Sequence, residues 1–240
     1  RSPAKTIVTI AGTNGKGSCI AALQALLAAA GYRVACYTSP HLINYRERIV
    51  IDGHCVSDEA ICEAFEQIEQ SRGQTSLTYF EFGTLAALIL MAREEPDVAL
   101  LEVGLGGRLD AVNILDADIA IVTGVALDHQ EWLGDDLNQI GAEKAAIARA
   151  GKPLICGDPN PVAGLIGTAE KVGAKLMVNG RDFSARQFVP LPETCLPPAS
   201  IACALQATSL ITGLTPSEVD TSAIGAVAVP GRFQKVTING

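Results

Sequence analysis

A lysine and three glycines stand together between an apolar run and an Ala/Leu-rich run near the start of the chain. The segment Gly12-Thr13-Asn14-Gly15-Lys16-Gly17-Ser18 follows the buried-strand pattern Thr6–Ile10 and leads into the helical pattern Ser18–Ala30. At such a strand-to-helix turn, backbone N–H groups and the helix dipole converge on an anion. The sequence therefore predicts a phosphate-binding loop, in which Lys16 reaches the β- and γ-phosphates of a nucleotide and the Ser18 hydroxyl faces magnesium.

The spacing of this loop departs from the common phosphate-loop pattern G-x-x-x-x-G-K-[ST]. The first glycine is shifted, and Gly17 separates Lys16 from Ser18. A glycine-rich turn that binds no ligand is the alternative. The position between a strand and a helix, together with the lysine, favours phosphate binding.

An acidic residue, Glu102, stands near the end of the apolar strand pattern Val98–Val103. An unpaired buried charge is costly, so packing alone would favour Val or Leu at this position. A bound cation would offset the cost, and Mg²⁺ commonly takes one or two protein groups together with phosphates and water. The alternative is a carboxylate that accepts hydrogen bonds from the glycine-rich turn 104–110. Glu102 is therefore a candidate magnesium ligand.

Other polar residues are ambiguous when they are taken singly. Asp128-His129 follows the strand pattern Ile119–Thr123, at the edge where open α/β sheets hold ligands. A lone histidine is more often structural, however, and imidazole is not a typical partner of Mg²⁺. Lys144 lies in a predicted helix, Gln139–Ala150, whose periodicity does not tell whether the lysine faces solvent or a site. The stretch Thr78-Tyr79-Phe80-Glu81 is typical of a simple helix cap.

The elements that must position these residues alternate between short apolar runs rich in β-branched residues and longer helical stretches, which is typical of βαβ units. Further strands are predicted at Val34–Tyr37, Leu154–Cys156 and Leu176–Val178, and further helices after the N-cap Ser57, at Glu81–Glu94 and at Ala199–Thr212. Asp52-Gly53 indicates a hairpin turn, and residues 181–198 indicate an irregular connector. We therefore predict an α/β fold with a P-loop-type, mostly parallel β-sheet flanked by helices.

Composition limits the class of protein and its partners. The 240 residues suffice for one large α/β domain, and 48% hydrophobic with 18% charged residues favour a compact core. A net charge of −8 disfavours bulk attraction to nucleic acid or to an anionic membrane. Seven cysteines without a C-x-x-C pair indicate reduced thiols, and no apolar run is long enough to span a bilayer. We expect a soluble, cytoplasmic protein.

Taken in order, these segments resemble the folylpolyglutamate synthase and dihydrofolate synthase family, of the bifunctional bacterial type, within the Mur ligase superfamily of ATP-dependent amide-forming enzymes. The matching stretches cover most of the chain: 11–18, Ser39-Pro40-His41-Leu42, 45–48, 77–81, 101–110, 127–129, 143–145 and 230–233. The phosphate loop indicates only the superfamily. The Ser-Pro-His-Leu loop and the Gly-Leu-Gly-Gly-Arg-Leu-Asp turn are similar to the folate branch.

The resemblance implies a role for each of several residues. The nucleotide would be bound by Thr13, Asn14, Gly15, Lys16, Gly17, Ser18 and Arg232. Magnesium would be held by Ser39, Glu102 and His129, and the catalytic group would comprise Lys16, His129 and Lys144, the last as a carbamylated lysine that supports a metal site. The pterin pocket would be lined by Thr78, Phe80, Asp110 and Ala111.

The same resemblance implies an enzyme that uses ATP and Mg²⁺ to add L-glutamate to dihydropteroate, to folate or to both, through an acyl phosphate. Residues 1–228 would form the Mur ligase central ATPase domain, and residues 229–240 would be an exit linker towards a C-terminal glutamate-ligase domain that this chain does not contain. The expected partners are small molecules (dihydropteroate or folate, and L-glutamate), with no nucleic acid and no membrane, and the expected state is a monomer.

One position departs from the family, because Ala199-Ser200 stands where an asparagine usually reads the nucleotide. Adenine recognition is therefore open. Three alternatives remain at this point: a peptidoglycan ligase that acts on a UDP-linked substrate, a nucleotide-binding module without catalysis, and a P-loop kinase.

Overall fold

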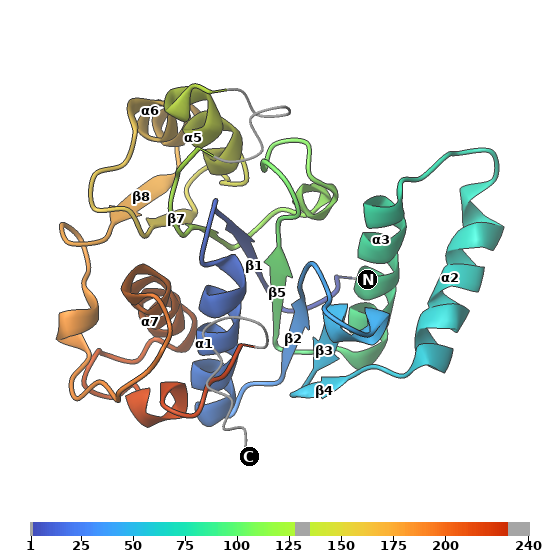
Figure 1. The fold of residues 1–240 in the computed structure, drawn as a ribbon, viewed down its shortest axis with the longest axis horizontal. Coiled ribbons are helices and arrows are strands. Elements are labelled where there is room, and N and C mark those ends of the chain that lie inside the picture. The colour runs from blue at the N-terminus through green and yellow to red at the C-terminus, as the bar shows by residue number, and fades with distance from the viewer. Residues whose placement is uncertain (1, 128–134, 230–240) are drawn as a thin grey trace, which may run out of the picture.

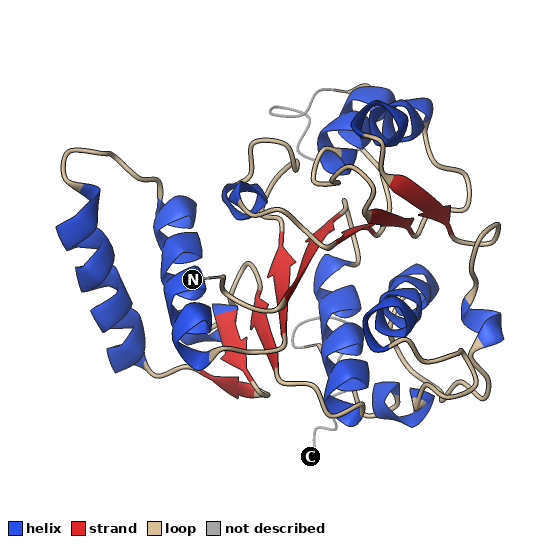
Figure 2. Cartoon of the chain, turned by 180° about the vertical axis from the view of Figure 1, so that it is seen from behind, coloured by secondary structure: helices blue, strands red, loops and turns tan. Residues whose placement is uncertain are grey.

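A single twisted sheet runs through the centre of the computed structural model, which describes residues 2–127 and 135–229 (Figures 1 and 2). Its strand order is β4-β3-β2-β5-β1-β6-β7-β8. The strands are β1 Thr6–Ala11, β2 Val34–Tyr37, β3 Ile49–Ile51, β4 His54–Cys55, β5 Val98–Glu102, β6 Ile119–Val122, β7 Pro153–Cys156 and β8 Lys175–Val178. Only the pairs β2–β3 and β3–β4 are antiparallel among these strands, which confirms the predicted α/β fold with a mostly parallel sheet.

Helices cover both faces of this sheet. Helices α1 (Lys16–Ala29) and α7 (Pro198–Thr212) lie side by side on one face (Figure 1). The other face carries α3 (Tyr79–Glu94), α5 (Leu137–Ala145) and α6 (Ala163–Val172), and α2 (Asp58–Arg72) packs on the outside of α3. Short 3₁₀ helices are η1 Tyr45–Arg48, η2 Ala111–Ile114, η3 Ala185–Gln187 and η4 Thr221–Ile224.

Strand β1 is buried on both faces, as its nearly continuous apolar run, interrupted only by Thr9, predicts. Ile7 and Ala11 belong to the core beneath α3, α5 and α6, whereas Val8 and Ile10 belong to the core beneath α1 and α7. Burial of alternate residues in two separate cores fixes the register of this strand, because a slip by one residue would exchange the two sets.

The strand order creates a crevice at the carboxyl ends of the central strands. From β1 the chain passes through α1 to β2, and β5 then fills the place between β2 and β1. The next strand, β6, lies on the opposite side of β1. Ligands of open α/β sheets bind at such a reversal, outside the carboxyl ends of the strands. The loops after β1, β5 and β6 therefore meet where a site is expected.

The predicted hairpin at Asp52-Gly53 is confirmed. Both residues have positive φ, 49° and 81°, and they join β3 to β4. A two-residue hairpin loop of this kind favours residues that accept the left-handed conformation, and Asp-Gly is among the best of them.

One predicted helix differs from the observed one, and one observed helix was not predicted. The helix predicted at Gln139–Ala150 is observed as α5, Leu137–Ala145. It ends early although alanines continue, because the Glu143 carbonyl oxygen, which would accept the Ile147 N–H in a longer helix, accepts the Arg108 N–H at 3.0 Å.

Helix α6 was not predicted. It contains Gly164 and Gly167, and glycine is a poor helix former. Gly164 is nevertheless required, because a Cβ there would lie 1.9 Å from the Asn138 carbonyl oxygen of α5. Among the described residues, no helix combines the length and the apolar character that crossing a membrane would need.

Candidate functional site

The loop between β1 and α1 lies in the crevice, at the centre of the sheet edge. Gly15 is the N-cap of α1, in the left-handed conformation (φ 85°), and no side chain caps the helix. The first turn of α1 contains no acidic residue, so the positive end of the helix dipole is not offset there. The Lys16 ammonium folds back over the loop and donates to the Gly12 carbonyl oxygen at 2.9 Å. This arrangement suits an anion.

Two glycines of the loop are needed because other groups approach them closely. A Cβ on Gly12 would lie 2.0 Å from the Thr123 hydroxyl oxygen, and one on Gly15 would lie 2.5 Å from the Ser200 hydroxyl oxygen. Both glycines also have positive φ. The side chain of Thr13 bonds the backbone of Ala126, accepting from its N–H and donating to its carbonyl oxygen, each at 3.0 Å. The loop is therefore attached to the segment that follows β6.

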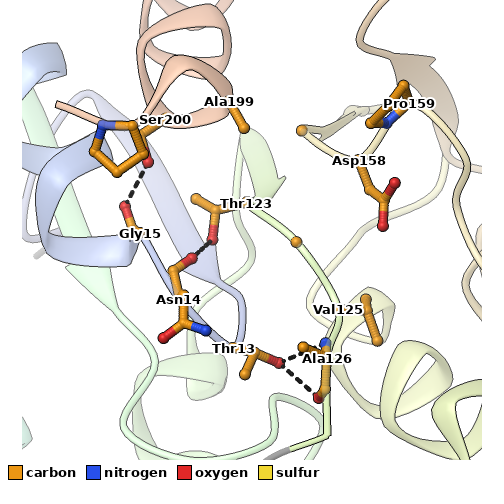
Figure 3. A pocket seen from close by; sticks show the side chains of 13 residues that line it. Thr13, Asn14, Gly15, Thr123, Val125, Ala126, Asp158, Pro159, Ala199 and Ser200 are labelled. Carbon is orange, nitrogen blue, oxygen red and sulfur yellow. Dashed lines mark hydrogen bonds between the residues drawn. The ribbon is translucent and has the colours of Figure 1, made fainter.

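A cavity of about 320 Å³ opens beside this loop (Figure 3). Its walls come from the segments after β6 and β7 and from the start of α7, and they include Val125, Ala126, Pro159, Pro197 and Ala199. Asp158 is the charged residue among those that line it. A mostly apolar slot that ends at a phosphate loop can accommodate a nucleoside next to its phosphates.

Ser200 stands at the start of α7, where the family pattern would have a residue that reads the base. Its hydroxyl instead donates to the Gly15 carbonyl oxygen at 3.0 Å (Figure 3). This hydrogen bond directs Ser200 to the loop backbone.

Glu102 ends β5 and is buried next to the phosphate loop. It pairs with Ile10 in the register of β1 and β5, and its Oε2 accepts the Ser39 N–H at 3.0 Å. The structure thus brings Ser39 and Glu102 together at the carboxyl end of the sheet. His129, the third expected metal ligand, lies outside the described residues, as does Arg232.

The groups present fit a magnesium ion better than a transition metal. Within residues 2–127 and 135–229, no cluster of three or more His, Cys, Asp or Glu side chains could hold a metal. Mg²⁺ does not need such a cluster, because one or two protein groups with phosphate and water oxygens complete its shell. Burial raises the pKa of the nearby Cys19 thiol to about 12, and the charge of Glu102 adds to this shift. In the absence of a metal, the thiol is therefore protonated at neutral pH.

Asp110 closes the glycine-rich turn after β5. Its Oδ2 accepts the N–H groups of Gly104 and Leu105 at 2.9 and 3.0 Å, and its Oδ1 accepts that of Val112 at 3.1 Å. Burial raises the pKa of this carboxyl, although the three N–H groups and the charge of Lys16 oppose the rise. Asp110 thus closes a tight turn through its own backbone contacts, and it also faces the second cavity of the site.

This second cavity holds about 370 Å³ and is lined by residues that include Glu81, Thr84, Arg108, Leu109, Asp110 and Ala111. Of the four residues expected around the pterin, Asp110 and Ala111 line this cavity. The Phe80 ring lies 5.8 Å from that of Tyr37, and its Cζ is 2.8 Å from where a Gly104 Cβ would stand. Thr78 caps α3 in a capping box with Glu81. The structural explanation for Thr78 is therefore observed, and its role in substrate binding stays a prediction.

Lys144 is buried in the last turn of α5, so it does not face solvent, which was one of the two possibilities that the periodicity left open. The glycine-rich turn rests on this part of the helix, because a Cβ on Gly107 would meet the Glu143 carbonyl oxygen at 2.4 Å. Arg108 fastens the same contact through its N–H to the Glu143 carbonyl at 3.0 Å and through its side chain to the Glu143 carboxylate at 2.8 Å. The turn that carries Asp110 and the helix that carries Lys144 therefore form one unit.

Thr123 and Arg149 were not identified from the sequence as parts of the site. Ser200 was noted only as part of the Ala199-Ser200 departure from the family pattern. Thr123 and Ser200 bond the phosphate loop, and Arg149 bonds the segment that lines the second cavity. No local pattern marks such contacts, since each joins segments that are distant in the chain.

Comparison with known proteins gives one family and close relatives within it. The Mur ligase middle domain matches residues 10–185. The dihydrofolate synthase/folylpolyglutamate synthase of Escherichia coli (strain K12) is 43% identical over 251 residues, covering 98% of this chain and 59% of the relative.

Solved structures agree with the sequence comparison. E. coli FolC in complex with DHPP and ADP has a TM-score of 0.92 at 44% identity, covering 98% of this chain and 60% of that one. A bifunctional folylpolyglutamate synthase/dihydrofolate synthase with Mn, AMPPNP and L-glutamate bound has a TM-score of 0.89 at 44% identity, covering 98% and 61%. The chain thus spans about three fifths of the length of these relatives.

Proposed function

The chain belongs to the Mur ligase family, and from this premise we propose that it forms the ATP-binding part of a ligase that adds L-glutamate to dihydropteroate, to folate or to both. One observation carries the proposal: an uncapped phosphate loop, a buried carboxylate and a second cavity lie together at one edge of the sheet. The relatives with bound ADP, or with AMPPNP, Mn and glutamate, support the same ligands.

The chemistry follows from the poor reactivity of a carboxylate towards amines. An oxygen of the substrate carboxylate attacks the γ-phosphorus of ATP, and ADP leaves. The amine of glutamate then attacks the carbonyl carbon of the acyl phosphate, the C–O bond to the phosphate breaks, and the amine gives up a proton. Lys16 and the loop N–H groups of Thr13 to Ser18 would neutralise charge on the transferring phosphoryl group, since positioning and electrostatics dominate such steps.

Magnesium would be held by Ser39, Glu102 and His129, where it would supply charge neutralisation to phosphate oxygens. Burial of Glu102 and its contact with the Ser39 amide support this assignment for two of the three. His129 and Arg232, the latter as an ATP contact, rest on the resemblance alone. Lys144, as a carbamylated lysine, would support a metal site, and its burial is consistent with this role.

The pterin-bearing substrate would occupy the second cavity, with Thr78, Phe80, Asp110 and Ala111 around it. We further propose domain limits of 1–228 with a linker at 229–240, a cytoplasmic location and a monomer with small-molecule partners. The net charge of −8 supports the absence of nucleic acid among the partners.

The test compares Lys16→Ala with Lys171→Ala, an exposed lysine of α6, in a version that includes the rest of the protein. Lys16→Ala should abolish phosphate release from ATP with dihydropteroate and glutamate, while its circular dichroism spectrum stays that of the parent. Lys171→Ala should leave activity unchanged. Undiminished turnover by Lys16→Ala would contradict the proposal.

Two other results would favour an alternative function. Preferential binding of a UDP-muramyl peptide over dihydropteroate would favour a peptidoglycan ligase. Nucleotide binding without turnover by the extended version without substitutions would favour a non-catalytic module.

A further inference from the structure

Two buried hydroxyl groups hold the phosphate loop from outside it (Figure 3). Thr123, directly after β6, donates to the Asn14 carbonyl oxygen at 2.6 Å. Ser200, in the first turn of α7, donates to the Gly15 carbonyl oxygen at 3.0 Å. The two residues are 4% and 1% exposed, so neither hydroxyl is a surface group.

These hydrogen bonds set the direction of the loop N–H groups. In a planar trans peptide, the C=O of one residue and the N–H of the next point in opposite directions. Because the Asn14 C=O points at Thr123, the Gly15 N–H points away from Thr123. Because the Gly15 C=O points at Ser200, the Lys16 N–H points away from Ser200. Consecutive N–H groups directed in this way form the concave donor sets that bind phosphate.

The glycines and the hydroxyls fit each other. The hypothetical Cβ of Gly12 meets Thr123 and that of Gly15 meets Ser200, so a larger residue at either position would push the hydroxyl away. Thr123 is itself fixed, since its N–H donates to the Ala11 carbonyl at 3.0 Å. The loop conformation is therefore determined jointly by β6 and α7.

We propose that Thr123 and Ser200 are positioning residues that aim the phosphate-loop N–H groups at the bound anion. They act through the backbone of Asn14 and Gly15, although Thr123 and Ser200 also line the cavity beside the loop. The inference rests on the proposed function in one respect, which is that the anion belongs to a nucleotide.

The two residues should differ in importance. The Gly15 carbonyl also accepts the Cys19 N–H at 2.9 Å and keeps that bond without Ser200. Within the described part of the chain, Thr123 supplies the hydrogen bond to the Asn14 carbonyl. Loss of the Thr123 hydroxyl should therefore disturb the loop more.

The experiment uses the chain with Thr123→Val, Thr123→Ser, Ser200→Ala and the matched control Thr208→Val. Thr208 is also fully buried, and its hydroxyl donates to the Ala204 carbonyl at 2.8 Å within α7. The control thus removes the same group from a similar environment. Two quantities are measured: amide hydrogen exchange of residues 12–18 without ligand, and the affinity for ADP with Mg²⁺ by calorimetry.

We expect Thr123→Val to speed exchange in residues 12–18 and to weaken ADP binding about 10-fold, as the loss of one hydrogen bond to a preorganised loop would do. Ser200→Ala should weaken ADP binding about 3-fold. Thr123→Ser keeps the hydroxyl and should weaken ADP binding less than about 2-fold. Thr208→Val should lower thermal stability without changing either quantity.

The inference is overturned if Thr123→Val affects exchange in the loop no more than Thr208→Val does. It is also overturned if Thr123→Ser is as damaging as Thr123→Val, since shape and not the hydroxyl would then matter. A parent chain that does not bind ADP would count against the proposed function, and the exchange comparison would still decide the present inference.

Discussion

Replacing Arg149 by alanine should release one wall of the second cavity. The Arg149 guanidinium joins the segment after α5 to the end of η2, in addition to the contact of the glycine-rich turn with α5. It donates to the carbonyls of Ile147 and Ala148 after α5, and also to Asn113 and Leu115 at the end of η2. Asn113 lines the cavity, so the same side chain supports both the fold and the proposed substrate site.

The size of the effect follows from which of these contacts are shielded from water. Arg149 is 24% exposed, whereas its ionic partner Asp116 is 87% exposed, so the ion pair contributes little. The bonds to buried and half-buried carbonyls matter more, at about 1 kcal/mol each, but water will replace some of them. We expect a loss of about 2 to 3 kcal/mol, which corresponds to roughly 5 to 10 °C in Tm for a domain of this size.

Thermal and urea unfolding of Arg149→Ala measure this loss, with Arg181→Ala as the matched control. Arg181 is mostly exposed and pairs only with its neighbour Asp182 among the described residues, so its removal should change stability by less than about 0.5 kcal/mol. Binding of dihydropteroate should weaken in Arg149→Ala and not in the control. Equal stability of the two variants would refute the conclusion that the hydrogen bonds of Arg149 stabilise the fold.

Three further outcomes are expected. Glu102→Gln should keep the fold, because its amide oxygen can still accept the Ser39 N–H, but should weaken Mg²⁺-dependent ADP binding about 10-fold in calorimetry; an unchanged Mg²⁺ dependence would contradict a metal role. Hydrogen bonds from Lys5 and from the Arg33 N–H lower the pKa of Asp97, so its contribution to stability is present above the ordinary pKa of about 4 and is lost as pH falls through the lowered value. The stability gap between the parent and Asp97→Asn in urea unfolding should thus be constant near neutral pH and close in acid, and a gap that widens in acid would show the opposite sign. Iodoacetamide at pH 8 should label the exposed Cys55, Cys62 and Cys195 and spare the buried Cys19, Cys36, Cys156 and Cys203; rapid labelling of any buried thiol, read by mass spectrometry, would show that its burial is incomplete.

The order of strands and helices could be predicted where the sequence has strong local signals. β1 is a run of β-branched, mostly apolar residues, α3 has the Thr78/Glu81 capping pair, and the β3–β4 turn has Asp-Gly. Each of these signals acts within a few residues, so the local sequence determines the local structure.

Features that depend on distant contacts could not be predicted. The end of α5 depends on the Arg108 N–H, which bonds the Glu143 carbonyl oxygen from a turn 35 residues away, and α6 contains Gly164 because α5 packs against it. The hydrogen bonds of Thr123 and Ser200 to the phosphate loop span 109 and 185 residues. The proposed roles of His129, Arg232 and Thr78 rest on family resemblance, since local physical chemistry does not distinguish them from structural residues.

The central place of β1 matters while the chain is being synthesised. This strand is translated before both of its neighbours, β5 and β6, which begin at Val98 and Ile119. Until both have left the ribosome, an apolar strand with unpaired edges is available to other chains, which is a known route to aggregation. Nascent fragments that stop before residue 119 should therefore depend on chaperones far more than fragments that include β6.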